Sequence, residues 1–109
     1  MYEIRSRKRC INGVPFKTYE RTLDTDESVV AIEAGSTGLL PDDKGGARTL
    51  ISFENLSESG IFGKVTKNEN GTLDEVEIGV VGNAETVSVL RALMFATKAI
   101  LDEFEEDEE

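Results

Sequence analysis

The chain has 109 residues, of which 39% are hydrophobic, and its formal net charge is −10. This length and apolar content suit one packed domain spanning residues 1–109, and they exclude a second domain and global disorder. The acidic total argues against general binding of DNA or RNA, because such proteins gain affinity by neutralising phosphates.

Histidine is absent and Cys10 is the only cysteine. The chain therefore lacks the usual general base near neutral pH, and it cannot form a zinc site of the Cys/His type. A single cysteine excludes an internal disulfide and indicates a reducing compartment. No apolar run approaches the ~18 residues that span a bilayer, and the first residues do not resemble a signal peptide. We expect a cytoplasmic binding protein, not an enzyme, with no metal or cofactor.

The first element in chain order is a predicted β-hairpin. Asn12 and Gly13 separate residues 2–11 from residues 14–23, and an Asn-Gly pair tolerates the positive φ of a tight turn. Pro15 lacks an N–H and should lie at a strand start or an edge. Residues 1–21 carry six of the twelve basic side chains, which leaves room for a local site that captures a small anion.

Two short apolar runs, at residues 29–32 and 49–53, have the length of strands. The connection between them, residues 35–48, holds four glycines and one proline. It is longer than most loops, so we expect it to be either functional or mobile.

A second hairpin is predicted around Asn70 and Gly71, where apolar and polar residues alternate from Val76 to Val80. This alternation indicates a strand with one buried face. The pattern gives an α+β fold, with a mainly antiparallel sheet of about six strands followed by a C-terminal helical segment.

The helical segment covers residues 84–105, either as one helix or as two that divide near Thr97. Asn83 is a suitable N-cap, and residues 103–109 form an acidic tail that we expect to fray. Apolar residues spaced by three and four form two adjacent faces, which is more apolar surface than one sheet covers. We therefore expect a homodimer or a higher homo-oligomer through this helix. The faces comprise Val87, Leu90, Met94, Thr97, Leu101 and Phe104, and Val89, Leu93, Ala96 and Ile100.

Arg91 is the most specific candidate for a ligand-binding residue. It is the only basic residue in the first two turns of the helix, and it lies one turn before Phe95. A guanidinium offers a planar set of donors that suits phosphate, and an aromatic neighbour can stack on a base. The alternative is that Arg91 extends into solvent or pairs with an acid of a neighbouring subunit.

Three further candidates carry weaker signals. Residues 79–84 lead a strand into a helix N-terminus, where an anion is favoured, although a simple tight turn with a cap is the favoured explanation. Arg48 ends the glycine-rich connection and provides a cation there. Phe62 follows a Ser-Gly turn and is either exposed for stacking or covers a second core.

The order of these parts resembles the first-described phage anti-Thoeris sponge proteins, which are small and combine an antiparallel sheet with C-terminal helical structure. The resemblance rests on the opening MYEIRSRKRCINGVPFKT, the stretch EAGSTG at residues 33–38, Arg48 before Thr49, Phe62, and the acidic helical end with Arg91.

This resemblance implies a specific function. Proteins of that family sequester cyclic ADP-ribose isomers, and some also bind cyclic di- or trinucleotides. They do not cleave these signals, and the Thoeris effector of the infected bacterial cell stays inactive. Their pockets lie between subunits. Carried over, Arg91 and Arg48 would bind phosphates, Phe62 would stack on adenine, and Asn83 would contact the base or ribose.

Two other functions remain open. A charge of −10 could imitate nucleic acid in a protein inhibitor, although the acids concentrate in the tail and do not line one surface. The chain could also be a structural subunit of a phage assembly. A mimic should compete with DNA in a salt-sensitive way, and a structural subunit should bind neither nucleotide nor a DNA-binding partner.

Overall fold

The computed structural model describes residues 4–25, 28–41, 43, 45–57 and 60–107. Within them it contains six strands and one helix. The strands are β1 (Arg5–Ile11), β2 (Val14–Thr25), β3 (Ser28–Ser36), β4 (Thr49–Asn55), β5 (Ile61–Lys67) and β6 (Leu73–Val80), and helix α1 spans Asn83–Asp107. All neighbouring strands in these residues pair antiparallel, which confirms the predicted α+β fold.

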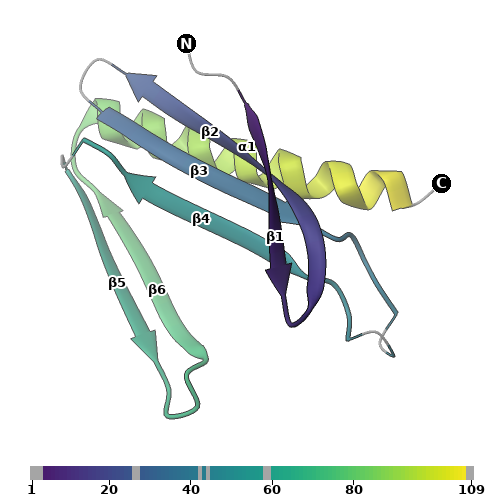
Figure 1. The fold of residues 1–109 in the computed structure, drawn as a ribbon. Coiled ribbons are helices and arrows are strands. Elements are labelled where there is room, and N and C mark those ends of the chain that lie inside the picture. Colours follow the sequence, from purple (N-terminus) through teal and green to yellow (C-terminus); the bar gives the residue numbers. More distant parts are fainter. Residues whose placement is uncertain (1–3, 26–27, 42, 44, 58–59, 108–109) are drawn as a thin grey trace.

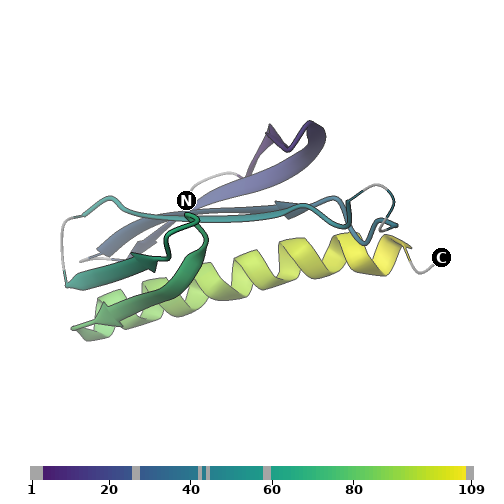
Figure 2. The same ribbon diagram turned by 90° about the horizontal axis from the view of Figure 1, so that it is seen from below.

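The strands form two sheets, whereas the sequence suggested one. Strands β1 to β4 form a four-stranded sheet in chain order, and β5 pairs with β6 alone. The β5–β6 hairpin diverges from β4 and points away from the larger sheet (Figure 1). Helix α1 lies along one face of the larger sheet, and the β1–β2 hairpin rises from the opposite face (Figure 2).

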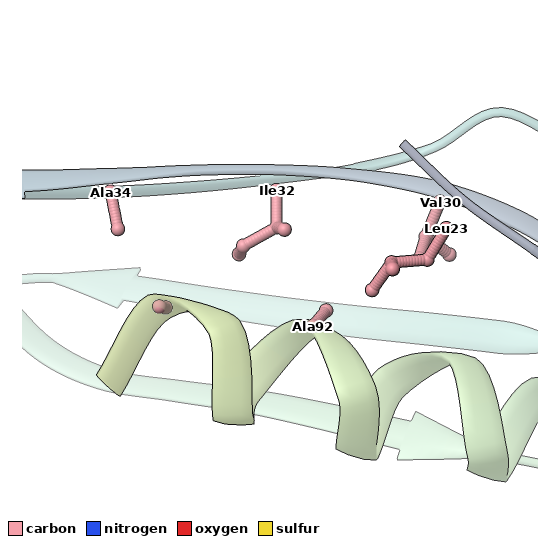
Figure 3. Packing of buried hydrophobic residues seen from close by; sticks show 6 residues of the cluster. Leu23, Val30, Ile32, Ala34 and Ala92 are labelled. Carbon is pink, nitrogen blue, oxygen red and sulfur yellow. The ribbon is translucent and has the colours of Figure 1, made fainter. Parts of the chain in front are cut away.

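The core lies between β3 and α1. Val30, Ile32 and Ala34 alternate along β3, so their side chains project from the same face of the sheet toward the helix (Figure 3). They meet the fully buried Ala92 and nearly buried Ala96 of α1. Because these alanines are small, the helix backbone approaches the sheet closely.

The first hairpin turns as predicted. Asn12 and Gly13 both have positive φ, of 49° and 81°, which is the requirement of a two-residue turn with the twist of the flanking strands. Pro15 lies at the second position of β2, opposite Cys10. Pairing with β3 begins only at Thr18, so the missing N–H of Pro15 breaks no bond on that side.

The second hairpin has a longer connection than an Asn-Gly turn. Residues 68–72 join the strands, and Gly71 has a φ of 84°. The Asn68 side chain organises this loop, because its Oδ1 accepts from the backbone amides of Asn70 (2.9 Å) and Thr72 (3.1 Å).

The C-terminal segment is one unbroken helix, so the alternative of two helices divided near Thr97 is wrong. The carbonyl of Gly82 accepts the first helical hydrogen bond from the amide of Thr86 (3.1 Å). Gly82 therefore takes the cap position, one residue before the predicted Asn83. The helix continues through residues 103–107, which we expected to fray. Judged over the described residues, no helix combines the length and apolar character needed to cross a membrane.

Candidate ligand site between β2 and α1

The four predicted ligand-binding residues do not converge on one site within a single chain. Asn83 and Arg91 are exposed on α1, eight residues and therefore about 12 Å apart along its axis. The start of β5, which carries Phe62, lies at the N-terminal end of α1, and the connection that ends at Arg48 lies at the opposite end of the molecule (Figure 1).

Arg48 is engaged by the backbone. Its Nη1 donates to the carbonyl oxygen of Gly46 (2.6 Å), and its Nε donates to that of Ile11 (3.3 Å). These bonds tie the 37–48 connection to the turn of the first hairpin. A phosphate would need the same N–H donors of Arg48, so a ligand that binds there would have to break these two hydrogen bonds.

Phe62 and Arg91 are both accessible. The Phe62 ring is 63% exposed, which leaves a face free for stacking. Among the described residues, no ion pair or hydrogen bond involves the Arg91 side chain. Arg91 shares a face of α1 with Phe95 and Lys98, four and seven residues further on.

A pocket of about 490 Å³ lies where this face of the helix meets β2. Its volume falls within the range of small-molecule sites, about 300–1,000 Å³. Two aromatic rings, two cations and two carboxylates line it. The lining residues are Ile4, Tyr19, Arg21, Phe95, Lys98, Ala99, Asp102 and Glu103.

Local periodicity explains how these side chains meet. Tyr19 and Arg21 are two residues apart in β2, so they project from the same face of the sheet, toward the helix. Phe95, Lys98 and Asp102 follow helical spacing and share the face of α1 that turns toward β2. The sequence analysis placed Phe95 one helical turn after Arg91, but it did not single out Tyr19 or Arg21. Alternation along residues 14–23 was the signal that could have found them.

The two cations of the pocket differ in their partners. Lys98 Nζ lies 3.3 Å from Asp102 Oδ1, an exposed pair one helical turn apart that contributes little to stability. Arg21 is half-buried and has no ion-pair partner among the described residues. Arg21 is therefore the cation most available to an anionic ligand.

A second cluster of charges lies on the opposite face of the sheet, around the buried carboxylate of Glu33. Arg9 binds both of its oxygens at 2.7 Å, and the Thr18 hydroxyl donates to Oε2 at 2.6 Å. Arg7 Nη1 adds a longer contact of 3.3 Å to Oε1. The hydrogen bonds from Arg9 are the main cause that lowers the pKa of Glu33 to about 2.

This cluster changes the interpretation of the basic N-terminal hairpin. We expected the hairpin to leave room for a site that captures a small anion. Two of its arginines instead bind an internal carboxylate, which already neutralises part of their charge. The Glu33 cluster is therefore a structural element that holds β1 against β3.

Comparison of the chain with protein-family models, with curated proteins and with solved structures finds no match. The resemblance to anti-Thoeris proteins therefore remains a prediction from the sequence, and the pocket between β2 and α1 is the candidate site on geometric grounds.

Proposed function

We propose that the protein binds a small anionic nucleotide in the pocket between β2 and α1 and sequesters it without cleaving it. The observation that carries this proposal is the composition of the pocket, where Tyr19 and Phe95 lie beside Arg21 and Lys98. Aromatic rings suit a purine base and cations suit phosphates. The resemblance to anti-Thoeris proteins supports a cyclic ADP-ribose isomer as the ligand, captured in the cytoplasm of an infected bacterium.

The energies of such contacts are adequate. A hydrogen bond to a charged group contributes about 1.5–3 kcal/mol, and base stacking on an aromatic ring contributes about 1–3 kcal/mol. Two cations and one or two stacked rings approach the ~12 kcal/mol of nanomolar binding only if water is excluded. Asp102 provides an acceptor for a ribose hydroxyl or an adenine amino group.

Arg91 does not line this pocket, but it lies one helical turn before Phe95, which does. Since it has no partner among the described residues, we assign it to a second phosphate contact. Arg48, Phe62 and Asn83 lie on other parts of the molecule, too far from this pocket to line it. Their proposed contacts with the ligand require a second subunit.

Calorimetric titration with a cyclic ADP-ribose isomer tests the assignment. We expect Arg21→Ala to raise the Kd by about 10–100-fold, because it removes a charge-assisted contact. Lys67→Ala is the matched control, since Lys67 is an exposed cation at the end of β5 and lies outside this pocket. Equal affinities for wild type, Arg21→Ala and Lys67→Ala would contradict the assignment.

A further inference from the structure

The β5–β6 hairpin stands apart from the rest of the chain (Figures 1 and 2). Its base is attached where the Val81 amide donates to the carbonyl of Gly60 (2.8 Å) and where Ile61 packs against the core. Beyond this base the two strands pair only with each other. An isolated two-stranded hairpin is marginally stable in water, so this one needs a surface to pack against.

One face of the hairpin is apolar and uncovered. Val65 pairs with Val76, and Ile78 lies two residues further along the same face. Val65 is 62% exposed, and the other two are exposed as well. This face and Ile51 of β4, itself 59% exposed, line a groove of about 710 Å³.

Helix α1 carries a second uncovered apolar surface, which we call the outer stripe. Met94 is 70% exposed, and its neighbours on the stripe follow helical spacing. The stripe lies on the side of the helix opposite the buried Ala92 and Ala96, and Met94, one turn before Lys98, borders the face that lines the β2 pocket. The outer stripe consists of Val87, Leu90, Leu93, Met94 and Leu101.

We propose that these two surfaces meet in a homodimer. The outer stripe of one chain lies in the groove between β4 and the β5–β6 hairpin of a second copy. A two-fold axis repeats the contact, so one chain contributes both a hairpin and a stripe. The pairing is self-complementary and covers all four apolar surfaces.

The dimensions of the two surfaces match. A strand of seven residues such as β5 spans about 20 Å. The stripe from Val87 to Leu101 covers fourteen helical steps, or about 21 Å. The hairpin therefore covers the stripe over its whole length.

The charges of the two segments are also complementary, in a chain whose net charge of −10 otherwise opposes self-association. Residues 61–80 contain two lysines and four acids, which gives −2. Within residues 86–101 the only charged residues are Arg91 and Lys98, and because Lys98 pairs with Asp102 at 3.3 Å, Arg91 is the cation left to meet the acids of the hairpin. The acids of the helix lie before and after this segment. If the hairpin shifted along the helix, its own acids would meet them, so repulsion disfavours other registers of hairpin and helix.

Sedimentation velocity at micromolar concentration tests the dimer. We expect wild type to sediment at twice the monomer mass of 11.9 kDa. Val65→Lys on the hairpin and Met94→Glu on the stripe should each raise the dimer Kd by about tenfold or more, because both place an unfavourable charge in the interface. Leu39→Lys is the control, since Leu39 is 70% exposed in the 37–48 connection, and it should remain dimeric.

Mixing the two variants makes the test specific. In a mixed dimer, one of the two contacts between hairpin and stripe is unaltered. In the other contact, the introduced lysine lies opposite the introduced glutamate. We therefore expect Val65→Lys and Met94→Glu chains to form dimers together although neither does so alone. Circular dichroism should show that both variants stay folded.

A monomeric wild type, or dimers that persist in both variants, would overturn the proposal. So would a mixture of the variants that stays monomeric. These results are independent of the test of the nucleotide pocket, which is the ligand affinity of Arg21→Ala.

Discussion

Glu33 is the residue on which the face of the sheet opposite α1 depends most. Its carboxylate is buried and is held by Arg9 and Thr18, which come from two other strands. Removing the charge leaves a guanidinium without its partner, and breaking a buried pair typically costs about 3–5 kcal/mol. Arg9 is only half-buried, which places the expected cost at the lower end.

The lowered pKa of Glu33 makes stability depend on pH. Its folded pKa is about 2, below the usual value of 4.5, so the ionised carboxylate favours the folded state. This contribution is fully present above the unfolded pKa and is lost as the pH falls through the folded pKa. We therefore expect the free energy of unfolding in urea to decrease from about pH 5 to about pH 2.

Glu33→Gln supplies the comparison for this prediction. The variant should be less stable near neutral pH by about 3 kcal/mol, and it should lose most of the acid-dependent decrease. Glu54→Gln is the control, because Glu54 is exposed on the same face of the sheet. An acid-dependent decrease of the same size in Glu33→Gln and wild type would show that Glu33 does not carry it.

At the scale of elements, the close approach of β2 to β3 depends on Gly35. A Cβ at this position would lie 2.4 Å from the carbonyl oxygen of Lys17 and 2.7 Å from the Cα of Thr18. Both are backbone atoms, so a side chain would force the strands apart. We expect Gly35→Ala to destabilise the protein by about 2 kcal/mol or more.

Gly63→Ala is the matched control, since Gly63 is also a strand glycine. Its Cβ would lie 3.7 Å from the Glu77 carbonyl oxygen, the nearest atom outside the adjacent residues, which is an ordinary contact. Its unfolding midpoint in urea should stay close to that of wild type. If Gly35→Ala unfolds at the same urea concentration as Gly63→Ala, the close approach does not constrain the sheet.

Elements set by local chemistry were predictable from the sequence. The turn at Asn12 and Gly13 follows from the φ values that these residues tolerate, and the helix follows from its apolar periodicity. The separation of β5–β6 from the larger sheet was not predictable, because alternation indicates a strand but not its neighbour. The Arg9–Glu33 pair joins residues 24 positions apart, and no local pattern connects them.

Only part of the candidate site was predictable, again because a sequence pattern shows local spacing and not tertiary contacts. The spacing of Arg91 and Phe95, one turn apart on the same helix, was visible in the sequence. The side of the pocket formed by Tyr19 and Arg21 depends on how α1 lies on β2, which is a tertiary relation. Arg48 illustrates the converse case, because its position in a glycine-rich connection suggested a ligand, whereas the structure engages it with backbone carbonyls.

At the scale of the whole molecule, α1 separates two surfaces of different character. The side toward β2 combines aromatic rings with cations, and the outer stripe, opposite the sheet, is apolar. In our account, the first surface binds an anionic nucleotide and the second binds another copy of the chain.

Capture and release of a nucleotide tests directly whether the protein sequesters an intact signal molecule. Purified protein is mixed with a panel of cyclic ADP-ribose isomers and cyclic oligonucleotides and passed through a filter that retains protein. The retained fraction is heated, and the released nucleotide is identified by mass spectrometry. We predict an intact cyclic nucleotide whose retention is lost in Arg21→Ala. Release of an altered nucleotide, or retention of none, would contradict the account.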